Sequence, residues 1–230
     1  MSPGPLYAVV TGDIVGSSKV ALHERQGLLD SLDSAFTGIR AFDAQGPGGL
    51  PPFEVFRGDS FQGILERADQ GLRAALLVRA VLRSQQGPGR GVRIDARVAI
   101  GIGPVQFLPG ERVGTGDGDA YRFSGGELED LKKRKVRLAV RTPWEQYNRE
   151  LRTESALADA ILRSWTPAQA GAVAHALHGR TQAEIAAILG ISQEAVFYRL
   201  HGAKYWAIQE FLARYSEVIS SAGRPGGGPR

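Results

Sequence analysis

The sequence predicts an α+β fold followed by a wholly helical region. Up to about residue 143, segments with strand periodicity alternate with segments that have helical spacing, and beyond that point every segment is helical. The clearest strand covers residues 92–102, where apolar side chains alternate with Arg93, Asp95 and Arg97. This alternation predicts one strand face in the core and one in water.

The N-terminal elements are expected in the order strand, helix, hairpin, helix, strand, helix, strand. Glycine- and proline-rich stretches separate them, as turns and loops require. In chain order they are a strand at 6–11, a helix at 20–42, strands at 53–56 and 61–65, a helix at 70–83, the strand at 92–102, a helix at 127–133 and a strand at 136–140. This order is that of a ferredoxin-like sheet with covering helices.

The change from mixed to helical patterning predicts a domain boundary near residue 148. We expect an α+β domain at 1–148 and an all-α domain at 149–221. The tail at 222–230, AGRPGGGPR, is expected to be disordered because it offers little apolar surface to bury.

The composition excludes several classes of site and partner. The 230 residues include no cysteine, so disulfides, thiolate zinc sites and cysteine nucleophiles are excluded. No apolar run is long enough for a membrane span, and the first residues lack the features of a signal peptide, so we expect a cytoplasmic protein without a membrane partner. The net charge of +4 is compatible with anionic partners but does not specify one.

Two acids follow predicted strands at positions that the sheet would bring together. Asp13 ends the first strand and Asp59 lies at the tip of the hairpin. Two carboxylates a few ångströms apart need a cation between them, and oxygen ligands of this kind suit Mg²⁺ or Mn²⁺. Gly12, Gly16 and Gly58 allow a phosphate to approach the backbone closely.

These segments resemble those of a known family. VVTGDIVGSS (9–18) and EVFRGDSFQGIL (54–65) look like the two metal-binding segments of class III nucleotidyl cyclases, and ARVAIGIGPV (96–105) is similar to the strand and turn that follow. Over about residues 6–140 the chain resembles the bacterial SatD-type proteins, which are built on that nucleotidyl cyclase-like fold. The resemblance implies metal ligands at Asp13, Asp59 and the Ile14 carbonyl. It also implies a nucleotide near Gly12, Gly16, Ser17, Gly58 and Arg122.

The chain departs from the cyclase pattern at the positions that carry catalysis. Arg122 stands where the family has an asparagine, a glycine stands near its arginine, and Val55 is closest to its purine-selecting lysine. Enzymatic activity, which would be that of a phosphorus–oxygen lyase, is therefore not the leading expectation. Ordinary roles also exist for both acids, a helix N-cap or turn for Asp13 and a hairpin turn for Asp59.

The basic run KKRKVR (132–137) has two interpretations. It could neutralise a polyphosphate or a nucleic-acid backbone. The favoured interpretation is a solvated helix end, where cations also complement the helix dipole.

A second motif lies in the helical region. A helix is expected to end near His178, followed by a short helix at 181–189, a turn at Gly190 and a helix after Ser192. Thr181 with Glu184 forms a capping box, and Ser192 is a good N-cap. The pattern T-x-x-E-I-A-x-x-L-G-I-S followed by A-V-x-x-R-L-H resembles the DNA-binding helix-turn-helix of sigma-factor region four and of LuxR-type regulators.

This resemblance implies double-stranded DNA as a partner. Residues 193–204 would form a recognition helix in the major groove, and the N-terminus of the preceding helix at Thr181 and Gln182 would bind phosphate. The candidate contacts are Gln193, Glu194, Phe197, Tyr198, Arg199, His201 and Lys204. The alternative is an oligomerisation surface built from Phe197, Tyr198, Tyr205 and Trp206.

The leading functional hypothesis is a DNA-binding transcriptional regulator whose cyclase-like domain binds a nucleotide, a divalent metal ion, or both. A homodimer is expected, because the helical domain is only mildly positive and a monomer would bind DNA weakly. Two alternatives remain open: an active nucleotidyl cyclase or nucleotidyltransferase with two metal ions at Asp13 and Asp59, and a degenerate cyclase-like dimerisation scaffold.

Overall fold

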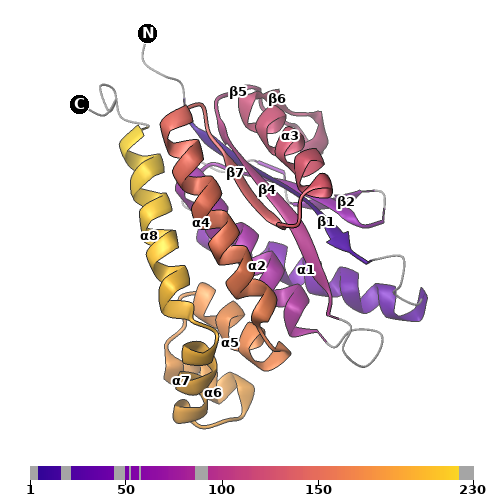
Figure 1. The fold of residues 1–230 in the computed structure, drawn as a ribbon. Helices are drawn as coiled ribbons and strands as arrows, with labels where there is room; N and C mark the ends of the chain where they lie inside the picture. Colours follow the sequence, from indigo (N-terminus) through magenta and orange to yellow (C-terminus); the bar gives the residue numbers. More distant parts are fainter. Residues whose placement is uncertain are drawn as a thin grey trace.

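The structure is a computed structural model that describes residues 5–16, 22–43, 50–51, 53–56, 58–85 and 93–222, with side chains of the first helix from residue 26 onward. A central sheet has helices on both faces, and further helices continue beyond one end of it (Figure 1). Ser17 and the predicted disorder of the tail lie outside the described residues.

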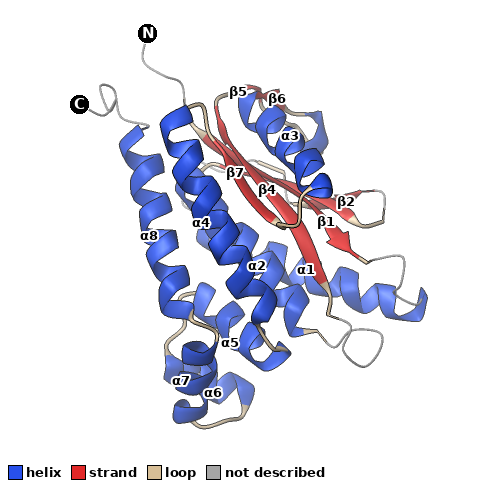
Figure 2. Ribbon diagram, in the orientation of Figure 1, coloured by secondary structure: helices blue, strands red, loops and turns tan. Residues whose placement is uncertain are grey.

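Figure 2 shows the strands between the helices. The elements are β1 (Tyr7–Val15), α1 (Leu22–Asp43), β2 (Glu54–Phe56), β3 (Ser60–Leu65), the 3₁₀ turn η2 (Ala68–Gln70), α2 (Gly71–Ser84), β4 (Asp95–Gly103), β5 (Val105–Phe107), η3 (Val113–Thr115), β6 (Asp117–Gly118), α3 (Asp119–Lys133), β7 (Leu138–Arg141), α4 (Glu145–Ser164), α5 (Pro167–Leu177), α6 (Gln182–Leu189), α7 (Gln193–Gly202) and α8 (Tyr205–Ala222). Among the described helices, none combines the length and the apolar character that a membrane crossing needs.

The main sheet has the order β2-β3-β1-β4-β7. Strand β1 is antiparallel to both β3 and β4, and β7 is parallel to β4. The first four strands, with α1 and α2 as the connections, have the ferredoxin-like βαββαβ order that the sequence predicts. Strands β5 and β6 form a separate small ribbon that the sequence analysis did not predict.

Strand β1 has two buried faces with different neighbours. Ala8, Val10 and Ile14 belong to the main core with residues of α1 and α2, whereas Val9 belongs to a smaller cluster with Ala120 of α3. The strand continues to Val15, so Asp13 is a strand residue and not the first residue after the strand. It lies on the α3 side because side chains two positions apart share a face.

The prediction that one face of strand β4 is exposed to solvent is wrong. Both of its faces are buried, and Asp95 is fully buried. The carboxylate is tolerated there because Arg79, Arg83 and Arg137 all donate to it. Asp95 therefore marks a buried ion cluster.

Helix α3 starts at Asp119 and not near Glu127 as expected. Gly125 and Gly126, which suggested a loop, lie inside the helix. The helix packs closely on β4, since a Cβ added at Gly101 would lie 2.1 Å from the Ala120 carbonyl oxygen. This tertiary contact outweighs the low helix propensity of the two glycines.

The C-terminal helices share the core of the sheet, so a separate all-α domain is not confirmed. Trp165 is fully buried, and its Nε1 donates to the Ala203 carbonyl at 2.8 Å. The Tyr215 hydroxyl donates to the Ala68 carbonyl at 2.9 Å, which joins α8 to the turn before α2. One continuous apolar cluster includes residues of β1, α2, α4, α5 and α8.

Candidate functional sites

The first candidate site is the end of the sheet around Asp13. In the strand register Asp13 lies between Ser60 of β3 and Arg97 of β4. Its side chain is 9% exposed, and Arg97 Nε donates to Asp13 Oδ1 at 2.8 Å. A cation of the protein itself therefore already neutralises this carboxylate.

The two predicted acidic segments are neighbours in the fold. The turn that carries Asp59 follows β2, and the Ile14 amide donates to the Asp59 carbonyl at 2.9 Å. The Asp59 carboxylate accepts a long hydrogen bond of 3.5 Å from the Ser60 hydroxyl. The topology thus brings the backbones of the two segments together.

A metal centre at this position would have at most two carboxylates as its side-chain ligands. Among the described residues, no three His, Cys, Asp or Glu side chains come together as a metal site. Two carboxylates with water and substrate oxygens are a sufficient donor set for Mg²⁺, but one of them, Asp13, is bound to Arg97. The metal role of Asp13, Asp59 and Ile14 remains a prediction, in which Arg97 competes for one oxygen of Asp13.

The three described glycines of the predicted nucleotide site have two different structural roles. A Cβ at Gly12 would lie 2.3 Å from the Phe61 ring and 2.7 Å from the Arg97 carbonyl oxygen, so this glycine is required by packing. Gly16 and Gly58 have φ values of +81° and +80° with open space around them. They are turn residues in the left-handed region.

A row of polar side chains beside Asp13 was not predicted. Thr11 Oγ1 donates to Ser124 Oγ of α3 at 3.0 Å and accepts from Gln62 Nε2 of β3 at 3.0 Å. The register places Thr11 opposite Gln62. Polar residues at alternate positions of both strands were the available signal for this row, and Arg97 belonged to the same pattern.

Arg122 is engaged by neighbouring acids. Its guanidinium lies 3.0 Å from Asp117 and 2.7 Å from Asp119, and its side chain is 55% exposed. These contacts hold it at the N-terminal end of α3. A role in nucleotide binding remains a prediction for this residue.

The basic run at 132–137 is mostly paired. Lys132 pairs with Glu129, Lys133 with Asp130 at 3.7 Å, and Arg134 with Glu127 at 3.9 Å. The run differs from a simple solvated helix end at one position, because Arg137 reaches the buried Asp95.

The second candidate site is the helix pair α6–α7. Thr181 and Glu184 form the predicted capping box, Gly190 closes α6 in the left-handed conformation with φ 63°, and the Ser192 hydroxyl accepts from the Ala195 amide. Ile185, Ala186 and Val196 form a small core between the two helices. The predicted helix, turn and helix are confirmed, although α7 ends at Gly202 and not at 204.

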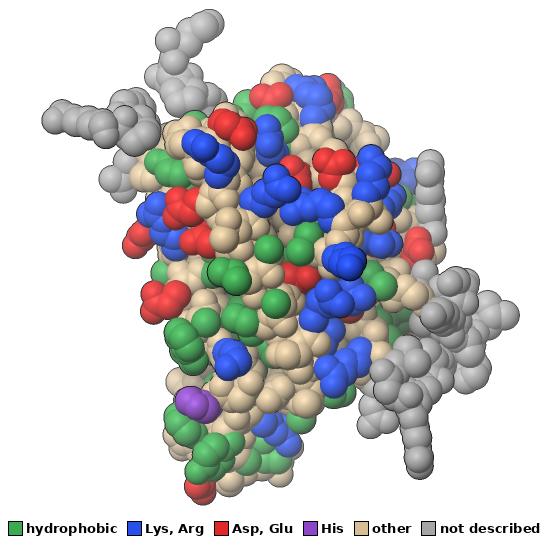
Figure 3. Space-filling model, in the orientation of Figure 1, with side chains coloured by type: hydrophobic (Ala, Val, Ile, Leu, Met, Phe, Trp, Pro, Cys, Tyr) green, Lys and Arg blue, Asp and Glu red, His purple; other side chains and the backbone are tan. Residues whose placement is uncertain are grey.

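The outer face of α7 is aromatic and polar. Phe197 and Tyr198 are 48% and 62% exposed, and the Phe197 ring stacks on His201 with centroids 5.7 Å apart. Gln193 is exposed one helical turn before Phe197. Figure 3 shows hydrophobic side chains with a histidine at the end of the molecule that α6 and α7 form.

The remaining residues predicted to contact DNA differ in how exposed they are to solvent. Arg199 is half-buried and Lys204 is exposed in the turn after α7, with φ 54°. Gln182 is half-buried at the start of α6. The Thr181 hydroxyl is used within the capping box, so phosphate contact at this position would come from the backbone amides of the helix N-terminus.

Comparisons with known proteins find only distant structural similarity. No family model and no curated protein matches the chain. Among solved structures, the GGEEF domain of a diguanylate cyclase from Vibrio cholerae matches with a TM-score of 0.44 and 13% identity, covering 61% of this chain and 84% of that domain.

Two further structures match at a similar level. The guanylyl cyclase domain of the RhoGC fusion protein from Blastocladiella emersonii has a TM-score of 0.42 and 18% identity, over 54% of this chain and 75% of that one. A bacterial light-regulated adenylyl cyclase has a TM-score of 0.39 and 18% identity, over 59% and 74%. Likenesses this low do not establish an activity, and membership of the SatD-type proteins is not confirmed.

Proposed function

We propose that the chain is a DNA-binding regulator that contacts double-stranded DNA through α7. The observation that carries this proposal is the helix pair itself, which combines a capping box, a left-handed glycine and an N-cap serine with an exposed face on the second helix. A helix presented in this way fits the major groove of B-DNA.

The side chains on α7 favour base contacts over phosphate contacts. Gln193 can donate to and accept from an adenine edge, and Phe197 can contact a thymine methyl group. Arg199 and Lys204 lie toward the C-terminal end of the helix, where they are available to phosphates on its flank. The proposed target is therefore an A·T-containing major groove, bound with a small number of phosphate contacts.

The test is fluorescence anisotropy with duplexes selected by the protein from a random pool at low salt. Gln193→Ala and Phe197→Ala are each expected to weaken binding to the selected duplex by about 1–3 kcal/mol, or roughly 5- to 150-fold. Gln146→Ala is the matched control, because Gln146 is an exposed glutamine on α4 and should leave affinity unchanged.

Absence of binding to any duplex at low salt, with or without nucleotides, contradicts the proposal. In that case a second function is favoured by the exposed aromatic side chains Phe197, Tyr198 and Trp206. These would form a homodimer interface, and sedimentation would show a dimer that Trp206→Ala converts to monomer.

A nucleotidyl cyclase or nucleotidyltransferase activity rests on the adjacency of Asp13 and Asp59. Arg97 holds one oxygen of Asp13, so a metal ion would bind the other oxygen or displace the guanidinium. Pyrophosphate release from a nucleoside triphosphate with Mn²⁺, lost in Asp59→Ala, would establish this activity. It would not exclude DNA binding, because the two sites lie in different parts of the chain.

A further inference from the structure

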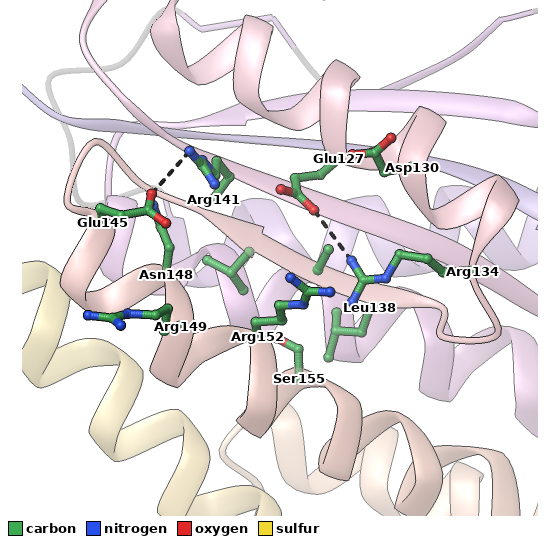
Figure 4. Close-up of a pocket in the computed structure, with 12 residues that line it drawn as sticks. Glu127, Asp130, Arg134, Leu138, Arg141, Glu145, Asn148, Arg149, Arg152 and Ser155 are labelled. Atoms are coloured by element: carbon green, nitrogen blue, oxygen red, sulfur yellow. Dashed lines mark hydrogen bonds and ion pairs between the residues drawn. The ribbon is translucent and has the colours of Figure 1, made fainter.

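A cavity of about 240 Å³ lies between α3, β7 and α4, away from both sites described above (Figure 4). Four arginines and three acids line it together with polar and small apolar side chains. The lining residues are Glu127, Asp130, Arg134, Leu138, Ala139, Val140, Arg141, Glu145, Asn148, Arg149, Arg152 and Ser155.

Two arginines of the cavity lack a strong counter-ion. Figure 4 shows the side chains of Arg134 and Arg152 extending toward each other across the cavity. Arg134 has only a distant ion pair, 3.9 Å from Glu127. Among the described residues Arg152 has no hydrogen bond or close ion pair, and the half-buried Glu127 is the acid that acts on both guanidinium groups. One carboxylate offsets only part of the repulsion between two guanidinium groups that face each other, so a further anion between them would be favourable.

A third group in the cavity has an unused hydrogen-bonding capacity. Ser155 is 1% exposed, and its hydroxyl has no hydrogen-bond partner among the described residues. It lies three positions after Arg152 on α4, so the two side chains share a helix face. Buried hydroxyls normally have partners, and an acceptor in the cavity would supply this one.

The frame around these groups is fixed. The Asn148 amide side chain accepts from the Thr142 amide at 2.8 Å and donates to the Thr142 carbonyl at 3.0 Å, which ties the start of α4 to the end of β7. Arg141 and Glu145 form an ion pair of 3.2 Å at the same end. The cavity is thus preformed on its α4 side, which lowers the entropy cost of binding.

We propose that this cavity binds the phosphate group of a small phosphorylated molecule, with Arg134 and Arg152 as the charged ligands and the Ser155 hydroxyl as a further donor. Guanidinium groups match phosphate oxygens in geometry and retain their charge. The volume of about 240 Å³ suits a phosphate or diphosphate group better than a complete drug-sized ligand. The rest of the molecule would extend out of the cavity.

The test is isothermal titration calorimetry on the full chain with inorganic phosphate, pyrophosphate and ATP as separate probes. Saturable binding of at least one probe tighter than about 1 mM is expected. Arg152→Gln should weaken it at least about tenfold, because one charge-assisted contact is lost. Arg163→Gln is the matched control, since Arg163 is an exposed arginine on the same helix that does not line the cavity.

Ser155→Ala separates a binding role from a structural one. If the hydroxyl binds the anion, this variant keeps the melting temperature of the ligand-free protein and loses affinity severalfold. An unchanged affinity in both Arg152→Gln and Ser155→Ala overturns the proposal, as does the absence of saturable binding of all three probes. Competition by double-stranded DNA that Arg152→Gln abolishes would assign these residues to DNA and would also overturn it.

Discussion

Asp95→Asn is expected to lower the free energy of unfolding by about 3–5 kcal/mol. The Asp95 carboxylate is fully buried and accepts two hydrogen bonds of 2.9 Å from Arg79, one of 3.1 Å from Arg83 and one of 3.0 Å from Arg137. Arg79 also lies 2.7 Å from Asp159, its one other acidic partner among the described residues. Removing the Asp95 charge leaves three arginines with one remaining carboxylate. Because Arg79 is buried, water cannot replace the lost carboxylate as its partner.

Urea unfolding followed by circular dichroism measures this loss. Asp117→Asn is the control, because Asp117 is 68% exposed and its ion pair with Arg122 should contribute no more than about 1 kcal/mol. Equal midpoints for the two variants would show that the cluster around Asp95 contributes little.

The ion cluster around Asp95 should also make the stability of the protein depend on pH. Burial alone would raise the pKa of Asp95, but Arg79 and Arg83 outweigh burial and lower its pKa to about 2. A carboxyl group with a lowered pKa in the folded state stabilises the protein at pH values above its unfolded pKa, and this contribution is lost as the pH falls toward about 2. The stability of Asp95→Asn should therefore change less between neutral and acid pH than that of the wild type.

Trp165→Ala is expected to destabilise the sheet and the C-terminal helices together, by about 3–5 kcal/mol. Trp165 is fully buried in the apolar cluster that both parts share, and it also donates to the Ala203 carbonyl. Amide hydrogen exchange is the appropriate measurement, and protection in β1 and in α8 should fall by the same factor. Trp206→Ala is the control, since Trp206 is 62% exposed and lies outside this cluster.

A different result for Trp165→Ala would support the domain boundary near residue 148 that the sequence predicts. In that case α4–α8 would lose protection while β1 and β4 kept theirs. The two parts would then unfold as independent units.

The sequence predicted best what local interactions determine. The caps at Thr181 and Ser192 and the turn at Gly190 depend on residues a few positions apart, and all three are confirmed. The ferredoxin-like arrangement of the first four strands followed from the periodicity and order of the elements, because few topologies are compatible with them.

Interactions between distant residues could not be predicted. The burial of Asp95 depends on arginines in α2 and before β7, so its charge suggested solvent exposure. Arg97 was assigned to the same wet face, although it pairs with Asp13 on the neighbouring strand. The cavity lined by arginines lies between three elements, α3, β7 and α4, and no short motif in the sequence marks it.

Because Arg97 contacts Asp13, it competes with any metal ion for this carboxylate at the end of the sheet. A guanidinium that the chain itself holds near a carboxylate has a high effective concentration, so a dissolved metal ion that binds Asp13 Oδ1 has to compete with it. Displacement would release the Arg97 guanidinium, which is then available to an anion. If a cation took the place of the Arg97 guanidinium at Asp13, the free guanidinium and the cation would both attract an anion, and each binding event would favour the other.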